Sequence, residues 1–221
     1  MAQAHVLNLG TVPYAAAWDL QRAVAAEVAE GTRPDTILLL EHPPTITTGR
    51  RTEESELHIP PDAQVEVVET DRGGKSTFHG PGQLVCYPIF DLKRHGQDVK
   101  RYCRDLEEAL ILTVRSLGVE GERIDGLTGV WLTRPPRKIA SIGIHISKWV
   151  TTHGYALNVD LDPAPFTQWI TACGLEDAMF TTIAKELGRP VSPDEVHSPA
   201  LDALAEVFNL VLEEQPALAA R

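Results

Sequence analysis

The sequence predicts a mixed α/β fold in which helices pack on a mainly antiparallel sheet. Segments 128–133, 138–147 and 150–159 read as strands separated only by short connections, as antiparallel pairing allows. Helical patterns flank this strand-rich middle, and neither a fixed-period repeat nor a Gly/Ser linker divides the chain. The length of 221 residues fits one domain, so we expect a single domain over residues 1–221.

The N-terminal half alternates helical and extended patterns. Residues 14–30 form an alanine-rich pattern that predicts a helix ending at Gly31. Residues 36–40 read as a short buried strand, and residues 65–69 alternate as a half-buried strand does. The stretch 72–83 holds four glycines and a proline, so we expect a loop there and no regular element.

The second half begins with an apolar run at 84–90. Apolar residues then recur at i, i+3, i+4 and i+7 over 98–118, which predicts an amphipathic helix ended by Gly118. The segment 193–214 also carries apolar residues on one helical face, and we expect one helix over that whole length.

Composition restricts the function classes. The net charge of −11, from 20 Lys and Arg against 31 Asp and Glu, disfavours nucleic acid as a partner. The sequence has no apolar run of about 18 residues and no signal-like N-terminus, so we expect no membrane association. Three cysteines form no disulfide framework and no zinc-ligand spacing, so we expect a cytoplasmic protein without a metal. No heptad seam is present, and a monomer is expected.

The first candidate site is RGGKSTFHGPGQ at 72–83. Its GGKST letters suggest a phosphate loop, but that motif needs a glycine five positions before Gly74, where Glu69 stands. The segment that follows is also strand-like, whereas a phosphate loop opens a helix. We therefore expect a loop whose backbone approaches a ligand, with Arg72 and His79 as polar side chains. A long surface turn is the alternative.

A second candidate is Cys173, which precedes a glycine beyond a short apolar segment. The other two cysteines fall on apolar faces and read as core residues. A thiol with a pKa near ~8.5 is mostly protonated at neutral pH, so a nucleophilic cysteine needs a nearby cation or base. Lys138, His79 and His153 are the candidates, and spacing does not choose among them. A solvated lysine at a strand end and hydrogen-bonded histidines are the structural alternatives. The His-Gly pair at 153–154 indicates a bulge or a close backbone approach.

Taken together, these segments resemble the lipoyl(octanoyl) transferase family, the octanoyl-[acyl-carrier-protein]–protein N-octanoyltransferases. The resemblance covers about residues 10–190 and keeps the family's order and spacing. It is carried by LLEHPPTITTGRR at 39–51, RGGKSTFHGPGQLVCYPIFDLK at 72–93, LTGVWL at 127–132, KIASIGIHIS at 138–147, HGYALNV at 153–159 and CG at 173–174. Ala172 departs from the family's usual proline, and FTTIAKELG departs from a common Thr-Ser pair. We expect activity to survive these departures, with a more mobile Cys173 loop.

The resemblance implies an α/β fold similar to the biotin and lipoate protein ligases, and a ping-pong acyl transfer. Cys173 would take an octanoyl group from octanoyl-acyl carrier protein as a thioester. The acceptor would be a lysine ε-amine on a lipoyl domain of 2-oxoacid dehydrogenases or of glycine cleavage H protein. Lys138 would lower the pKa of Cys173 and move protons. No cofactor is implied, because the acyl group arrives on the phosphopantetheine arm of the carrier.

The resemblance also implies which residues line the acyl pocket. They are Arg72, Gly73, Gly74, Lys75, Ser76, Thr77, Phe78, His79, Ser141, Ile142, Gly143, Gly154, Tyr155 and Ala156. The glycines among them let backbone N–H groups approach a thioester carbonyl and form an oxyanion hole.

Three other functions stay open. An ATP-dependent lipoate or biotin protein ligase would share the fold and the lysine but would need no cysteine nucleophile. A thiol-dependent thioesterase would release free octanoate. A catalytically silent module would bind the acyl carrier without any covalent adduct.

Overall fold

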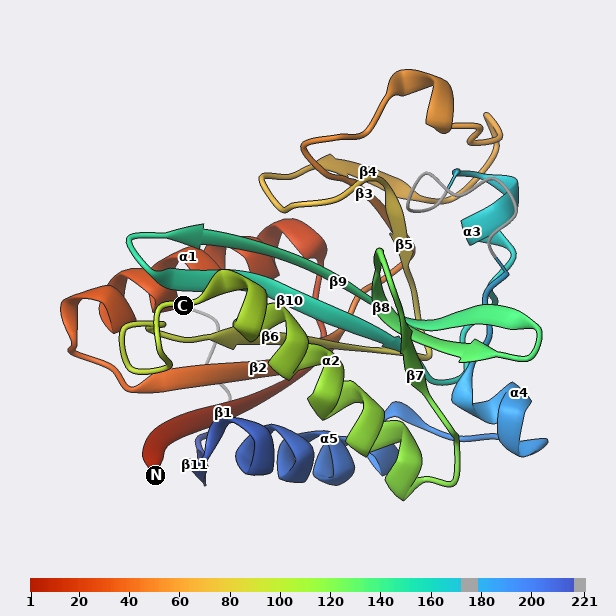
Figure 1. Cartoon of the computed structure of the whole chain (residues 1–221). Helices are drawn as coiled ribbons and strands as arrows, with labels where there is room; N and C mark the ends of the chain where they lie inside the picture. Colours follow the sequence, from red (N-terminus) through yellow and green to blue (C-terminus); the bar gives the residue numbers. More distant parts are fainter. Residues whose placement is uncertain (172–178, 217–221) are drawn as a thin grey trace.

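An eight-stranded mixed sheet forms the centre of the computed structural model, which describes residues 1–171 and 179–216 (Figure 1). Its strands are β1 (Ala2–Thr11), β2 (Asp35–Glu41), β6 (Gln83–Ile89), β7 (Glu122–Ile124), β8 (Leu127–Thr133), β9 (Pro136–Ser147), β10 (Val150–Asn158) and β11 (Leu210–Glu214). They lie in the order β11-β1-β2-β6-β10-β9-β8-β7. β1 pairs in parallel with β2 and β11, and the other pairs are antiparallel. The mixed α/β fold is thereby confirmed.

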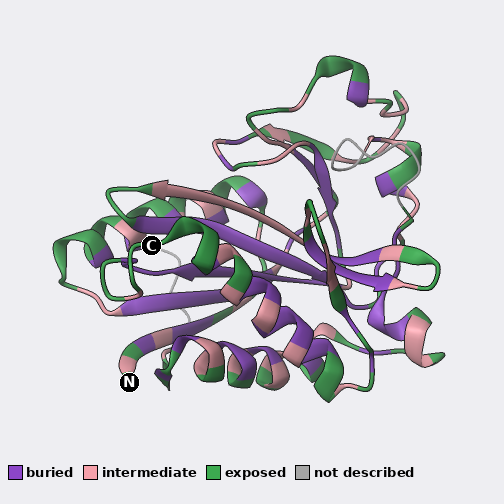
Figure 2. Ribbon diagram, viewed as in Figure 1, coloured by how far each residue is buried: buried purple, intermediate pink, exposed green. Residues whose placement is uncertain are grey.

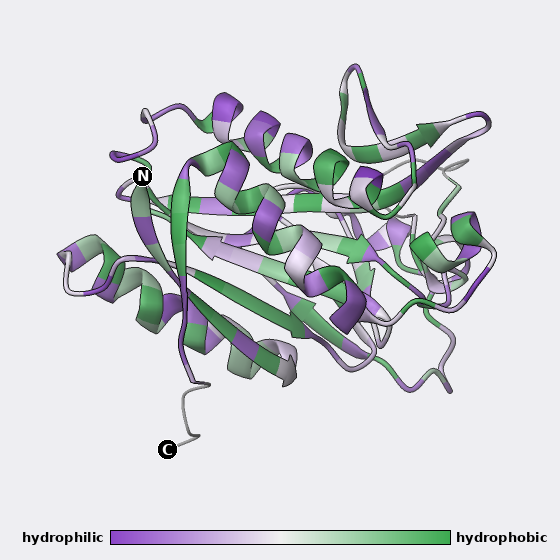
Figure 3. Ribbon diagram, turned by 90° about the horizontal axis from the view of Figure 1, so that it is seen from below, coloured by the Kyte–Doolittle hydropathy of each residue, from purple (hydrophilic) through white to green (hydrophobic). Residues whose placement is uncertain are grey.

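Helices cover both faces of this sheet. α1 (Tyr14–Glu30) packs its buried Ala17, Val24 and Val28 on one face. α2 (Val99–Ser116) and α5 (Pro193–Phe208) lie against each other on the opposite face, over the larger core cluster. The central strands are largely buried (Figure 2), and the outward sides of the helices are mostly hydrophilic (Figure 3). Burial of apolar surface on both faces is what holds the three layers together.

Helix boundaries follow local capping chemistry. α1 ends at Gly31, which adopts a left-handed conformation with φ 74°. Asp98 begins α2 by accepting hydrogen bonds from the backbone N–H groups of Lys100 and Arg101. In α5, Ser192 and Glu195 form a reciprocal capping box.

A smaller three-stranded sheet lies beside the large one, at the upper right of Figure 1. It consists of β4 (Glu66–Glu69), β3 (Thr45–Thr48) and β5 (Thr77–His79), and a short helical turn, η1 (Glu54–Glu56), lies between β3 and β4. A separate apolar cluster that includes Ile46, Phe78 and Phe166, the last from α3 (Pro165–Gln168), packs beneath it. The expectation of a loop throughout 72–83 was therefore wrong, because three residues between its glycines pair with β3.

The C-terminal helix is shorter than the sequence indicated. α5 ends at Phe208, since Asn209 adopts a left-handed conformation with φ 54°. The residues that follow form β11 beside β1, and neither strand was expected from the sequence. A further helix, α4 (Ile183–Leu187), precedes α5. No helix among the described residues is long and apolar enough to cross a membrane.

Candidate active site

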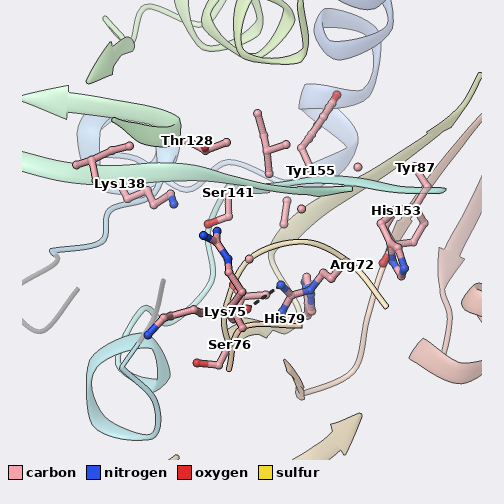
Figure 4. Close-up of a pocket in the computed structure, with 18 of the residues that line it drawn as sticks. Arg72, Lys75, Ser76, His79, Tyr87, Thr128, Lys138, Ser141, His153 and Tyr155 are labelled. Carbon is pink, nitrogen blue, oxygen red and sulfur yellow. Dashed lines mark hydrogen bonds between the residues drawn. The ribbon is translucent and has the colours of Figure 1, made fainter. Parts of the chain in front are cut away.

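A cavity of about 230 Å³ lies between strands β9 and β10 and the loop that leads into β5 (Figure 4). This volume is below the roughly 300–1,000 Å³ of common ligand pockets, which suits a narrow, chain-shaped ligand. Its lining residues are Tyr14, Arg51, Arg72, Gly74, Lys75, Ser76, Thr77, His79, Tyr87, Gly126, Leu127, Thr128, Trp131, Lys138, Ser141, Ile142, Gly143, His153, Gly154, Tyr155 and Ala156. Of the expected site residues that the structure describes, all line this cavity except Gly73 and Phe78.

Strands β9 and β10 form one wall through facing small residues. Gly154 pairs with Gly143, and Ala156 pairs with Ser141, in an antiparallel register. A Cβ added at Gly154 would collide with the backbone carbonyl of Cys86 on β6. The close backbone approach predicted from the His-Gly pair is therefore confirmed: the missing side chain at Gly154 lets β10 lie against the backbone of β6.

Arg72 braces the loop that forms the opposite wall. Its side chain is buried, and its guanidinium donates hydrogen bonds to the carbonyl oxygens of Thr47 and Lys75, both at 2.7 Å. The backbone N–H of Gly73 donates to the carbonyl of Ile144 on β9 at 2.9 Å, so it is committed to holding the loop and not to an oxyanion. Phe78 points into the apolar cluster under the small sheet and is not part of the cavity lining.

Lys138 lies at the start of β9 with only 3% of its surface exposed, so the alternative of a solvated lysine at a strand end is wrong. Its Nζ lies 5.1 Å from the centroid of the Trp131 ring on β8, a cation–π contact. Gly129, also on β8, makes room for it: an added Cβ would lie 2.8 Å from Cε of the lysine. In Figure 4 the side chain points along the cavity toward Ser141.

Cys173 and Ala172 lie outside the described residues, and the chain on either side of them is anchored at the site. The backbone N–H of Lys138 donates to the carbonyl of Met179 at 2.7 Å. The backbone N–H of Thr171 donates to the carbonyl of Glu56 at 2.9 Å, and the carboxylate of Glu56 binds the ammonium of Lys75 from the cavity loop. One flank of the cysteine segment is thus bonded to Lys138 itself, and the other is bonded to Glu56, which holds the lining residue Lys75.

Three buried histidines surround the end of the cavity far from Lys138. Burial lowers the pKa of His42 to about 4, lowers the pKa of His153 to about 4, and lowers the pKa of His79 well below its usual range. All three rings are therefore neutral at pH 7. Their hydrogen-bond partners then fix the tautomers.

His153 is clamped between Asp71 and Tyr14. Its Nε2–H donates to the Asp71 carboxylate at 2.8 Å, and its Nδ1 accepts from the Tyr14 hydroxyl at 3.2 Å. His42 donates from Nδ1 to the Val12 carbonyl at 2.6 Å and accepts the hydroxyl proton of Tyr87 at Nε2, at 2.7 Å.

The third ring, His79, donates from Nδ1 to the Gln83 side-chain oxygen at 2.8 Å, and its Nε2 lies 3.4 Å from the Thr47 hydroxyl. His79 and His153 thus use both ring nitrogens in the fold. Of the three groups considered from the sequence as partners for Cys173, Lys138 therefore remains the candidate. Within residues 1–171 and 179–216, no group of three or more His, Cys, Asp or Glu side chains could hold a metal ion.

Several lining residues escaped the sequence analysis. Tyr14 begins the alanine-rich helical pattern, and nothing local marks it as a site residue. Tyr87 stands inside the motif at 72–93, so it carried a signal although it was not expected in the site. Trp131 stands inside the quoted LTGVWL motif, and Arg51 ends the quoted LLEHPPTITTGRR motif, so both carried a signal. The Trp131 indole N–H is buried and has no hydrogen-bond partner among the described residues, which leaves a donor at the Lys138 end of the cavity.

The lipoyl protein ligase A/B catalytic domain matches this chain over residues 13–205. The chain belongs to that family. An octanoyltransferase of Mycobacterium tuberculosis is 51% identical over 209 residues, which cover 94% of this chain and 88% of the relative. Similarity this extensive includes every described element of the cavity.

Solved structures resemble this family member in fold. A lipoate-protein ligase A bound with ATP superimposes with a TM-score of 0.77 at 16% identity, covering 98% of this chain and 90% of the other. A biotin protein ligase of Aquifex aeolicus bound to biotin and ATP gives 0.58 at 13% identity, covering 95% and 71%. The likeness to lipoate and biotin protein ligases expected from the sequence is therefore confirmed for the fold.

Proposed function

We propose that this protein transfers an octanoyl group from octanoyl-acyl carrier protein, through a thioester on Cys173, to the ε-amine of a lysine on a lipoyl domain. The observation that carries the proposal is the buried Lys138, which lies at one end of a narrow cavity. Its backbone is bonded to the segment that follows the cysteine. The extensive identity to an octanoyltransferase supports the same reaction. We expect a cytoplasmic monomer that acts without a cofactor.

In the first half-reaction the Cys173 thiolate attacks the thioester carbonyl of the donor. An ammonium at Lys138 favours the thiolate through opposite charge, as a nearby cation does for any thiol. The carbon–sulfur bond to the carrier breaks, the carrier's phosphopantetheine leaves as a thiol with the proton that Cys173 gave up, and the octanoyl group stays on Cys173.

In the second half-reaction the neutral amine of the acceptor lysine attacks the Cys173 thioester. The amide bond forms, the bond to the Cys173 sulfur breaks, and one proton moves from the amine to that sulfur. Lys138 can relay this proton as a general base and then a general acid. The thiol is thereby restored for another donor.

The cavity supplies binding energy for the alkyl chain. Eight carbons contribute roughly 5–6 kcal/mol when fully buried, at about 0.8 kcal/mol per CH₂. Ile142 and Ala156 line the cavity and offer apolar surface to the chain. The acyl group is thus held by its tail while the reacting carbon is presented near Lys138.

Intact-protein mass spectrometry tests the proposal. The protein is mixed with octanoyl-acyl carrier protein without ATP, in parallel with Cys173→Ser and with Cys103→Ser, a matched change at a half-buried cysteine on α2. We expect one octanoyl adduct on the wild type and on Cys103→Ser, none on Cys173→Ser, and discharge by a lipoyl domain to an amide.

Each alternative function gives a different result. Discharge to free octanoate would identify a thioesterase. Absence of any adduct, with turnover that requires ATP and free acid, would identify a ligase of the kind that the fold neighbours represent. Binding of the carrier without an adduct or turnover would identify a silent binding module.

A further inference from the structure

The cavity has an open end and a closed end. Gly126 and Thr128, which line it beside Lys138, are exposed. At the other end Tyr14 and His153 each expose only 1% of their surface. Figure 4 shows the two ends of the cavity, with Lys138 and Thr128 on one side, Tyr87 and His153 on the other, and Ser141 between them.

The distance between the two ends matches a particular acyl length. Lys138 and Gly143 are five residues apart along β9, so the distance between their backbones is roughly 16 Å at about 3.3 Å per residue. The lysine side chain itself reaches roughly 6 Å into this space, and an extended eight-carbon chain spans roughly 9 Å, at single-bond lengths near 1.5 Å. A chain that begins beside the lysine nitrogen therefore ends near the pair formed by Gly143 and Gly154.

Beyond that pair stands a wall of aromatic rings. The Tyr14 ring stacks on His79 with centroids 5.7 Å apart and lies 4.9 Å from the His42 ring. Burial raises the pKa of Tyr14 to about 12, so its hydroxyl stays protonated and donates to His153. The ring nitrogens and hydroxyl groups of the wall are bonded to one another or to Val12, Asp71 and Gln83, so the wall can face an alkyl tail without leaving unpaired donors.

The wall is held in place by an unusual backbone. His153 has φ 57° within strand β10, a left-handed conformation that costs free energy for a residue with a Cβ. Its backbone N–H donates to the Gln21 side-chain oxygen at 2.6 Å, and its ring is bonded to Asp71 and Tyr14 as described above. Three separate bonds thus fix the histidine that positions Tyr14.

We propose that Tyr14, held by His153, ends the acyl pocket and limits the transferred group to about eight carbons. This assignment rests on the proposed octanoyl transfer and adds the residue that selects chain length. Arg72 and the glycines shape the sides of the pocket, whereas Tyr14 blocks the direction in which a longer chain would extend.

Competition among donors tests the assignment. Equal amounts of octanoyl-, decanoyl- and dodecanoyl-acyl carrier protein are offered to each variant, and the adducts after a single turnover are compared by mass. The wild type should favour octanoyl. Tyr14→Ala should raise the decanoyl-to-octanoyl ratio by at least tenfold, because each additional buried methylene contributes about fourfold once the wall is removed. Tyr14→Phe keeps the ring and should stay within about twofold of the wild type.

Tyr102→Ala is the matched control, since Tyr102 is an equally buried tyrosine on α2 that does not line the cavity. It should lose stability without changing the ratio. If Tyr14→Ala does not fold, as judged by thermal melting, Tyr14→Leu provides the same comparison with a smaller cavity. An unchanged ratio in a folded Tyr14 variant, or an equal shift in Tyr102→Ala, would overturn the assignment. Absence of any adduct on the wild type would instead refute the transfer reaction itself.

Discussion

Acidification should destabilise this protein through its three buried histidines. In the folded state burial lowers the pKa of His42 and His153 to about 4 and that of His79 well below its usual range, whereas in the unfolded chain each ring titrates near ~6.5. Between these values the unfolded state binds protons that the folded state does not. The stability that the neutral rings contribute is therefore complete above about pH 6.5 and is lost as the pH falls toward 4.

The size of the effect follows from linkage. At pH 5.0 a ring that titrates at about 4 when folded and at about 6.5 when unfolded lowers the free energy of unfolding by about 2 kcal/mol. His42 and His153 together account for about 4 kcal/mol between pH 7.5 and 5.0, and His79 adds to this. Since a typical domain is stable by about 5–15 kcal/mol, such a loss is readily measured.

Urea unfolding followed by tryptophan fluorescence at pH 7.5, 6.5, 5.5 and 5.0 provides the measurement. His153→Gln should remove about 2 kcal/mol of the pH dependence, whatever it does to stability at pH 7.5, since glutamine does not titrate. His58→Gln changes an exposed histidine outside the cluster and serves as the control. A free energy of unfolding that stays constant from pH 7.5 to 5.0 would refute the neutral, buried state of these rings.

Two further predictions concern the cavity wall and the core thiol. Gly129→Ala should cost more stability than the about 1–3 kcal/mol that its φ of 114° implies, because the added Cβ would also collide with the carbonyl oxygen of Ala140. It should slow acylation as well, because the same Cβ would lie 2.8 Å from Cε of Lys138; acylation rates and urea melts measure both. Gly188→Ala, also at positive φ but in open space, should lose stability alone, and equal acylation rates in the two variants would contradict the positioning role. Burial raises the pKa of the Cys86 thiol to about 12, which leaves about a thousandfold less thiolate than at the ordinary value near 9. Pulsed alkylation should therefore label Cys86 only after unfolding, and rapid labelling of the folded protein would show that the site is open.

The elements with strong local periodicity could be predicted from the sequence. The helical patterns over 14–30 and 98–118 correspond to α1 and α2 nearly residue for residue, because an apolar stripe and a terminal glycine define each. β11 could not be found in this way. Its residues, LVLEE, continue the apolar pattern of α5, and only a parallel partner about 200 positions earlier in the chain makes them a strand.

Part of the candidate site could be predicted from the sequence, and part could not. The glycine-rich loop and Lys138 stand in motifs whose letters carry information, and they line one cavity in the structure. The ring wall is different: Tyr14 begins α1, Tyr87 belongs to β6, and His153 belongs to β10. His153 and Tyr87 stand in motifs that the sequence displays, but Tyr14 does not. The three rings meet only when both strands and the helix are in place, so no spacing rule connects them.

Glycines inside strands are the one local signal that anticipates this geometry. A strand glycine weakens the sheet, because it packs no side chain and has more conformational freedom to lose. Two glycines lie in strands despite this cost. Gly129 on β8 leaves space for the Lys138 side chain, and Gly154 on β10 allows contact with the Cys86 backbone. Local weakness in otherwise well-formed strands thus coincides with the surroundings of Lys138 and with the β9–β10 wall of the cavity, as expected where function overrides stability. The same reasoning applies to the left-handed His153, whose strain is retained because it orients the ring that positions Tyr14.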